Sequence, residues 1–370
     1  MTKVLIILLA VIAVLGTGGW TYLQHPKFGP SNAAMPSARI LASPNYADGE
    51  FRNLVDTPLF TEEISFLAMV FRNLTEEKPD GLRPTSPLPS VKADLKALDK
   101  SEDVIVWLGH SSFYVQLGGR RILIEPVFST FAAPAPLTNK AFDGTTPYSA
   151  ADMPEIDYLL ITHEHWDHLD YDTVTALRPK TRHVVVALGV GAYLELWDYP
   201  KDRILELDWN ERVELDPGLT IHALPARHYT RRLLSSNQTL WVSFALVSDR
   251  RRLFFSGDSG YGPHFAEIGE RFGGFDMAAL DSGQYSPSWV YIHMTPEEAA
   301  QAAEDLQART MMPIHVGKFA ISKHTWNEPF IRLVEASHDR AYRLMTPLIG
   351  KPVDLNDQQQ ELSRWWEGLE

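Results

Sequence analysis

The 370-residue chain contains no cysteine. This absence excludes disulfide bonds, thiolate metal sites and a cysteine nucleophile. Any metal site in the protein would therefore be built from histidine and carboxylate side chains. Positive charge is also scarce: 34 lysines and arginines face 47 aspartates and glutamates, a formal net charge of −13. Without a basic surface to offset phosphate charge, nucleic acid is not an expected partner.

One long apolar run stands at the N-terminus, where an unbroken stretch at 4–15 continues without a charge to Trp20. It covers about 17 residues, at the short end of the length that crosses a bilayer. Trp20 and Tyr22 lie where an interfacial aromatic belt is expected, between Lys3 and Lys27. We therefore expect residues 1–24 to form a single-pass transmembrane helix. A cleaved signal segment is the alternative.

The remaining sequence has ordinary globular composition, with 45% hydrophobic residues in the chain as a whole. Residues 25–100, rich in proline, serine and asparagine, are predicted to be an extension that packs on the core, with one helix at 60–74. Over 101–353, hairpin-like strands come first and alternating strands and helices follow, which predicts an α+β domain of two facing mixed sheets with helices outside. Residues 354–370 are predicted to be a tail, with a helix that packs its two tryptophans, 365 and 366, on the body.

Histidines cluster in the segment THEHWDHLD, residues 162–170, directly after the apolar run IDYLLI. His163 and His165 are two residues apart, so in extended chain they point to the same side and can share one ion. Asp167 and His168 lie where a helix is expected to begin and can reach a second ion. The segment therefore favours a two-metal site over a single-metal site.

Three later loops offer further ligands, each just after an apolar strand. They contribute His228, Asp258 and His315. Because strand ends that meet at one edge carry sites on their loops, these side chains are expected to join the cluster. Asp258, with two oxygens, can bridge both ions. Four other histidines (183, 222, 264 and 338) are interpreted as ordinary structural residues.

Several segments resemble one branch of the metallo-β-lactamase-fold hydrolases. The segment THEHWDHLD resembles their H-x-H-x-D-H signature, and the sequences WLGHSSFYVQLGGRRILIEPVFS, PARHYTRR, FFSGDSGYGPHF, the run at HMTPEEA and MPIHVGKFAISKHTWNEP resemble N-acylphosphatidylethanolamine-hydrolysing phospholipase D and the bacterial RomA proteins. The resemblance spans about residues 104–330. It implies an αβ/βα four-layer sandwich and two zinc ions, although iron or manganese also suits such ligands. One zinc would be held by His163, His165 and His228, the other by Asp167, His168 and His315, with Asp258 bridging.

The resemblance also implies supporting residues. His293 matches a histidine near the active centre of the phospholipase branch, and His110 and His324 fall in family segments. The family usually reads Asp-Pro where this chain has Glu125-Pro126, and the longer carboxylate can still hold a ligand histidine. Arg231 or Arg232 could clamp a phosphate, with a solvated surface position as the alternative.

The sequence thus predicts a zinc-dependent hydrolase that cleaves a phosphodiester, with an N-acylated phosphatidylethanolamine or a related phospholipid as its substrate. Asp167 or Asp258 would orient the attacking water, and His293 would assist the leaving alcohol. A lactonase, an esterase or a soluble phosphoesterase on the same two metals is the first alternative. A membrane-tethered metal-binding envelope protein without turnover is the second. The expected location is the bacterial inner membrane, with the hydrolase domain in the periplasm; the oligomeric state is left open.

Overall fold

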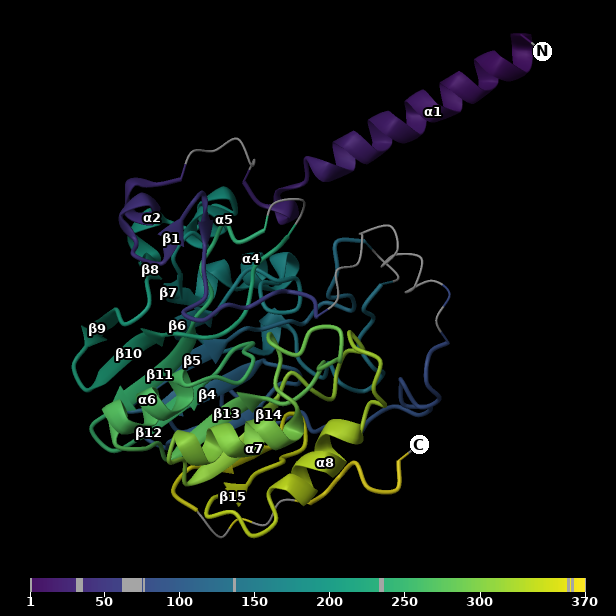
Figure 1. Ribbon diagram of the computed structural model, residues 1–370. Helices are drawn as coiled ribbons and strands as arrows, with labels where there is room; N and C mark the ends of the chain where they lie inside the picture. Colours follow the sequence, from purple (N-terminus) through teal and green to yellow (C-terminus); the bar gives the residue numbers. More distant parts are fainter. Residues whose placement is uncertain are drawn as a thin grey trace.

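The structure is a computed structural model, and it describes residues 2–30, 36–61, 75, 77–135, 138–232, 236–357, 360 and 363–369. Two seven-stranded sheets form the body (Figure 1). The predicted helix at 60–74 falls almost wholly outside the described residues.

The first sheet is built mainly from the first half of the hydrolase region. Strands β5 to β8 run parallel, and β3, β4 and β16 extend the sheet in antiparallel pairs. A tight turn at Gly118 and Gly119, with φ of 56° and 73°, joins β4 to β5 as a hairpin. The strands, in sheet order, are β16 (Pro352–Asp354), β3 (Val104–Trp107), β4 (Phe113–Leu117), β5 (Arg120–Ile124), β6 (Ile156–Ile161), β7 (Thr181–Ala187) and β8 (Ile204–Leu207).

The second sheet has the same plan, since β12 to β15 run parallel and β9 to β12 pair in antiparallel fashion. Its strands, in sheet order, are β15 (Arg343–Leu344), β14 (Thr310–Ile314), β13 (Met277–Asp281), β12 (Arg252–Phe255), β11 (Ser243–Ser248), β10 (Leu219–Leu224) and β9 (Arg212–Asp216).

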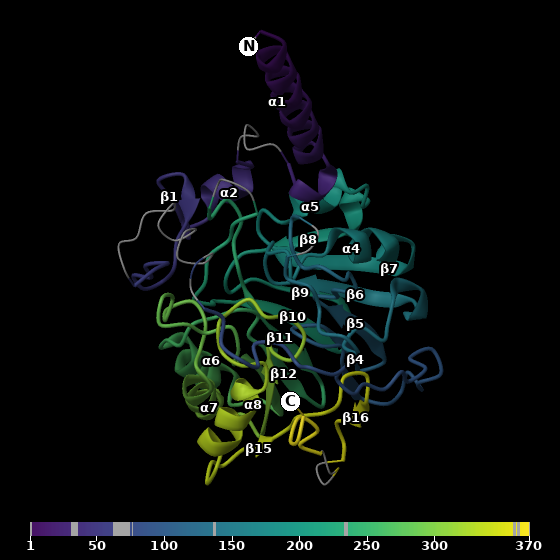
Figure 2. The ribbon, with the colours of Figure 1, turned by 90° about the vertical axis from the view of Figure 1, so that its right-hand side faces the viewer.

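Side-chain alternation explains why the two sheets stack. In β13, Met277 and Ala279 enter the core shared with the first sheet, whereas Ala278 and Leu280 face the opposite way. That outer face is covered by α6 (His264–Phe272), α7 (Pro296–Asp305) and α8 (Glu328–Ala336). The helices α4 (Tyr171–Leu177) and α5 (Gly191–Leu196) lie beside the first sheet, near β7 and β8 (Figure 2). The predicted sandwich with helices outside is therefore what the structure shows.

The N-terminal helix α1 (Thr2–Leu23) projects away from the body (Figure 1). In the part of the chain that the structure describes, no helix combines the length and apolar character needed to cross a membrane. The prediction of a transmembrane helix is therefore not supported. The unbroken apolar run is shorter than the roughly 20 residues that a span needs, and Thr17, Gly18 and Gly19 interrupt it.

The extension and the tail both contribute to the body. Besides η1 (Pro26–Phe28), the extension forms α2 (Ala38–Ala42) and a small hairpin of β1 (Tyr46–Ala47) and β2 (Glu50–Phe51). In the tail, Trp365 and Trp366 are buried, and Trp366 stacks on Phe330 with ring centroids 4.8 Å apart. The described tail residues form turns, so the tryptophans pack as expected without a helix. The domain boundaries proposed above stay a prediction.

Candidate metal centre

The structure gathers all seven side chains predicted as metal ligands at one edge of the sandwich. The loop after β6 carries four of them, and three more follow β10, β12 and β14. The carboxyl ends of these strands point to the same edge of the sandwich, and loops at such an edge meet. The seven are His163, His165, Asp167, His168, His228, Asp258 and His315, all within groups whose ligand atoms lie within 4.8 Å of one another.

Three histidines form the first half of this centre, which we call the three-histidine set. The Nδ1 atom of His165 lies 2.9 Å from Nε2 of His163 and 3.2 Å from Nε2 of His228. The far nitrogens of two rings are held from outside. His163 Nδ1 lies 2.9 Å from the Thr162 hydroxyl, and His228 Nδ1 lies 3.0 Å from the carbonyl oxygen of Ile292. Both contacts leave the Nε2 atoms facing the shared centre.

Asp167, His168 and His315 form the second half, which we call the acid-rich set. The Oδ2 atom of Asp167 lies 3.4 Å from Nε2 of His168 and 3.2 Å from Nε2 of His315. Carboxylates outside the set support its ligands. Glu125 lies 2.7 Å from Nδ1 of His168 through Oε2, and its other oxygen accepts hydrogen bonds from Thr162. Glu125 thus contacts a candidate ligand, as the predicted supporting role requires, and His168 presents its Nε2 atom inward.

Asp258 joins the two sets through one oxygen. Its Oδ2 atom lies 3.7 Å and 3.6 Å from Nε2 of His163 and His228, and 3.2 Å and 3.4 Å from Nε2 of His168 and His315. Ligand atoms around a tetrahedral zinc with bonds near 2.05 Å stand about 3.3 Å apart. The spacings within both sets are close to that value. In addition, His168 Nε2 and Asp258 Oδ1 are buried without a hydrogen-bond partner among the described residues. The residues present therefore fit a two-metal centre.

The charges of the two sets differ. Burial lowers the pKa of His163 and His228 well below the ordinary value, and lowers the pKa of His165 to about 4. Burial acts the same way on His168 and His315, but their carboxylate neighbours, with Asp258 the strongest, overcome it. The pKa of His168 is raised well above its ordinary value, and that of His315 is raised to about 10. The carboxylates of the acid-rich set therefore favour positive charge in their midst, and a bound cation would supply that charge.

The pKa values of the two carboxyl groups complete this picture. Burial favours their neutral forms, yet His168 and the other nearby histidines hold the pKa of Asp167 and of Asp258 well below the usual range. Both groups are therefore carboxylates at neutral pH. The site brings together two carboxylates and five histidine rings, which is a ligand set for divalent cations.

Strained backbone accompanies three of these loop residues. His110, Glu125 and His315 have φ of 56°, 45° and 62°, in the left-handed region that favours glycine. Such conformations cost on the order of 1–3 kcal/mol each and persist where the surroundings over-determine them. His110 also supports the acid-rich set, since its Nε2 atom lies 2.8 Å from Oδ2 of Asp167. The structure thus places His110 against a candidate ligand, and its supporting role stays a prediction.

Asp281 is a residue of the site that sequence reasoning missed. This buried carboxylate ends β13, and its Oδ2 atom lies 2.8 Å from Nδ1 of His293. Its Oδ1 atom lies 3.4 Å from Nδ1 of His315. The ring of His293 stacks on His315 with centroids 4.8 Å apart, so the predicted catalytic histidine lies at the centre. The signal that identified Asp258, an acidic residue just after an apolar strand, could also have identified Asp281.

Other predicted residues lie elsewhere. Arg232 is buried, and its guanidinium donates to the carbonyl oxygens of Lys27 (2.8 Å), Glu164 (2.5 Å) and Leu169 (3.0 Å). The prediction that Arg232 clamps a phosphate is therefore wrong, because its guanidinium is buried and donates to three backbone carbonyl oxygens. The ring of His324 accepts a hydrogen bond from the Gln284 backbone at 3.0 Å, so it organises a neighbouring loop.

Arg231 lies near Tyr229, whose ring contacts the three-histidine set. Its charge opposes the effect of burial on the neighbouring Tyr229, which raises the pKa of that tyrosine to about 12. The Tyr229 ring lies 4.7 Å from the ring of His165. A substrate contact for Arg231 stays a prediction.

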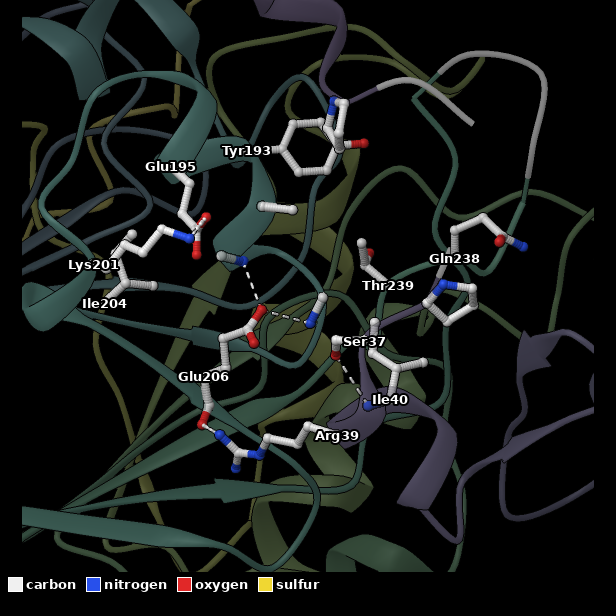
Figure 3. Close-up of a pocket in the computed structure, with 15 residues that line it drawn as sticks. Ser37, Arg39, Ile40, Tyr193, Glu195, Lys201, Ile204, Glu206, Gln238 and Thr239 are labelled. Carbon is white, nitrogen blue, oxygen red and sulfur yellow. Dashed lines mark hydrogen bonds and ion pairs between the residues drawn. The ribbon is translucent and has the colours of Figure 1, made fainter. Parts of the chain in front are cut away.

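A cavity of about 410 Å³ lies away from the ligand cluster, between the N-terminal segment and α5 (Figure 3). Its charged groups are already paired. Glu206 accepts from the backbone N–H groups of Gly189 and Gly191 at 2.8 and 2.9 Å, and Lys201 pairs with Glu195 at 2.7 Å. None of the seven candidate ligands lines this cavity, so it is separate from the metal centre.

Comparison with known proteins places the chain in a family. A sequence model of the Beta-lactamase superfamily domain matches residues 120–316. The chain belongs to the metallo-β-lactamase superfamily. The outer membrane protein RomA of Klebsiella pneumoniae is 55% identical over 100 residues, covering 27% of this chain and 76% of RomA. N-acyl-phosphatidylethanolamine-hydrolyzing phospholipase D 1 of Caenorhabditis elegans is 32% identical over 248 residues, covering 64% of this chain and 69% of the worm protein.

A solved structure has a similar fold. Igni18, a metallo hydrolase from the archaeon Ignicoccus hospitalis, matches with a TM-score of 0.54 at 21% identity, over 68% of this chain and 97% of Igni18. The predicted fold and the resemblance to the phospholipase D and RomA branch are thus confirmed. The chain is a metallohydrolase of this superfamily.

Proposed function

We propose that this metallohydrolase uses two zinc ions to cleave a phosphodiester, in a phospholipase D-type hydrolysis of an N-acylated phosphatidylethanolamine or a related phospholipid. The observation that carries the proposal is the position of Asp258, whose single Oδ2 atom lies 3.2–3.7 Å from Nε2 of four histidines. One oxygen shared by two ligand sets is the arrangement of a two-metal hydrolase. The likeness to the worm phospholipase D supports the choice of reaction.

The three-histidine set would hold one zinc ion and the acid-rich set the other, with Asp258 between them. When bound, the ions supply an activated water near neutral pH and offset negative charge on a phosphoryl group. The protein supplies orientation. His110 fixes the Asp167 carboxylate through Oδ2. Asp167 and Asp258 are then placed to accept a proton from the attacking water.

His293 is the group proposed to assist the leaving alcohol. Asp281 holds the ring by its Nδ1 atom, and the stack on His315 fixes the plane of the ring. These two contacts leave Nε2 as the nitrogen that can donate a proton to the leaving oxygen. Such general acid catalysis is worth about 10²–10⁴-fold in rate.

A lipid-panel assay of the purified chain, with its metal content measured in parallel, tests the proposal. We expect the wild type to bind two zinc ions and to release an N-acylethanolamine and a phosphatidic acid from N-acylated phosphatidylethanolamine. Asp258→Asn should lose more than about 100-fold of the activity, beyond the loss typical of residues that only support a ligand. Asp216→Asn serves as the control, because Asp216 pairs with Tyr158 and Arg120, which are not among the candidate ligands or their supports.

The same assay separates the alternatives. Cleavage of lactones or carboxylic esters without phosphodiester cleavage would replace the proposal with a lactonase or esterase. Equal activity on a soluble bis-phosphodiester, with no gain from lipid, would point to a soluble phosphoesterase. Two bound zinc ions without turnover on any substrate would leave a metal-binding protein.

We also propose, from the sequence, that the protein acts at the bacterial inner membrane with its hydrolase domain in the periplasm. Cell fractionation with protease accessibility of the body tests this location. A body found entirely in the cytoplasmic fraction would contradict it.

A further inference from the structure

The N-terminal extension reaches the metal centre through Asn53. The Nδ2 group of Asn53 donates to the carbonyl oxygen of His228 at 2.8 Å, and its Oδ1 atom accepts from the N–H group of the same histidine at 3.1 Å. Trp241 donates its indole N–H to the same Oδ1 atom at 3.2 Å. One amide side chain thus engages both peptide groups of a single candidate ligand, 175 residues further along the chain.

The backbone around His228 needs such a partner. Residues 225–230 follow β10 without regular secondary structure, so no strand supplies hydrogen bonds to them. Backbone N–H and C=O groups away from water require partners. Asparagine carries an NH2 donor group and a carbonyl acceptor side by side, the same kinds of group that a neighbouring strand would offer.

The residue before His228 is held by the same extension. The guanidinium of Arg227 donates to the Thr57 hydroxyl and to the carbonyl oxygen of Asp56, both at 3.0 Å. A third bond, also 3.0 Å, runs to the carbonyl oxygen of Tyr261, beyond Asp258 in the same loop. The extension is therefore hydrogen-bonded to the His228 loop at two consecutive residues.

We propose that Asn53 is a positioning residue for His228, which makes the extension a working part of the three-histidine set. The sequence model of the superfamily domain begins at residue 120, so this contact comes from outside the matched domain. The inference rests on the metal-binding part of the proposed function and is independent of the substrate. Residues that orient a metal ligand typically contribute 10–100-fold in metal affinity.

Zinc release from the full-length chain tests the inference. Wild type, Asn53→Ala and Asn45→Ala are loaded with zinc, and release to a colorimetric chelator is followed in time. Asn45 is the matched control, because it also lies in the extension but bonds to Asp208 (2.7 Å) instead of a ligand loop. The visible spectrum of each cobalt-substituted protein reports the coordination geometry directly.

We expect Asn53→Ala to release one of the two ions about tenfold faster, with an altered cobalt spectrum. Asn53→Asp, which keeps the acceptor and loses the donor, should fall between wild type and alanine. Asn45→Ala should match wild type in both readouts. Wild-type release and spectrum in Asn53→Ala would overturn the inference, and so would an equal effect in Asn45→Ala. Absence of bound metal in the wild type would instead contradict the proposed function and, with it, this inference.

Discussion

The two halves of the metal centre are supported in opposite ways. The three-histidine set is held by neutral groups, namely a hydroxyl at His163, a carbonyl oxygen at His228 and the Asn53 amide behind it. The acid-rich set is held by carboxylates, Glu125 at His168 and Asp281 near His315. The second set therefore depends on charge, because a carboxylate partner makes an imidazole a stronger ligand. The orientation of the first set depends instead on how its neutral partners are placed.

A buried cation also lies near each set, and the two cations differ in their hydrogen bonding. Arg232, next to the loop that carries His163 and His165, has three backbone acceptors. Lys318 lies near the acid-rich set, with its side chain packed against Gly109, the residue before His110. Among the residues that the structure describes, its ammonium donates to one carbonyl oxygen, that of Val127 at 2.7 Å. A buried guanidinium with several hydrogen-bond acceptors stabilises a loop. A buried ammonium with too few acceptors instead lowers the stability of the folded state.

The largest expected effect comes from Arg232→Met. The change leaves the carbonyl oxygens of Lys27, Glu164 and Leu169 without their donor, and it removes a cation that lies 3.9 Å from the centre of the Trp166 ring. We expect the free energy of unfolding, measured by urea denaturation, to fall by at least about 3 kcal/mol.

Arg178→Met is the control for this prediction, because Arg178 is partly exposed and donates to one carbonyl oxygen at 2.9 Å. Its cost should stay within about 1 kcal/mol. Equal losses in the two variants would remove the distinction between a buried, fully bonded arginine and a surface one.

Glu125→Gln is expected to weaken the acid-rich set alone. An amide cannot serve both His168 and Thr162 as the carboxylate does, and His168 becomes a poorer ligand. We expect one phase of zinc release to accelerate by about 10–100-fold. The accelerated phase should differ from the one changed in Asn53→Ala, and the double variant should accelerate both.

Glu206→Gln is the matched control for that variant, since Glu206 is a partly buried carboxylate that accepts from Gly189 and Gly191 instead of a ligand. Acceleration of the same phase by Glu125→Gln and Asn53→Ala would show that the two sets do not behave as separate halves.

Much of this centre could be predicted from the sequence, because its ligands share a local signal. Each follows an apolar strand, and strands that run in the same direction deliver their ends to one edge. The spacing of His163 and His165 fixes their common side over two residues. The predicted ligands thus depended on short-range pattern and on sheet topology, both of which the sequence carries.

The supporting residues could not be predicted in the same way. Asn53 contacts His228 across 175 residues, and nothing in the composition of its loop marks that contact. Arg232 carried a surface-like signal, an arginine pair in a polar loop, yet it is buried against three carbonyl oxygens. Such partnerships are decided by how distant segments pack, and a single sequence does not encode them in a local pattern.

Asp281→Asn distinguishes the two histidines that Asp281 contacts. The carboxylate lies 2.8 Å from His293 but 3.4 Å from His315, so its hydrogen bond to His293 is the stronger contact. We expect kcat to fall about tenfold or more with KM nearly unchanged, because His293 is the group proposed to act on the leaving alcohol. Zinc release should stay close to that of the wild type. A large increase in the rate of zinc release, with kcat unchanged, would instead show that Asp281 acts mainly on His315.

A pH dependence of stability is expected from Lys318. Burial lowers the pKa of this lysine from 10.5 to about 7, although Asp170 opposes the shift. Below pH 7 the lysine is charged in both states, and the folded state bears the whole cost of burying the charge. Between pH 7 and about 10.5 the unfolded chain keeps a proton that the folded chain has released, so stability rises with pH through this range.

Lys318→Met removes the titration and leaves a side chain of similar length. The variant should gain stability relative to the wild type at pH 6, and this gain should shrink steadily as pH rises toward 10. Loss of the bond to Val127 adds only a pH-independent offset. Urea denaturation of both proteins at four pH values gives the difference directly. A difference that stays constant from pH 6 to pH 10 would mean that the ammonium is as well solvated as Arg232, and the contrast between the two buried cations would fail.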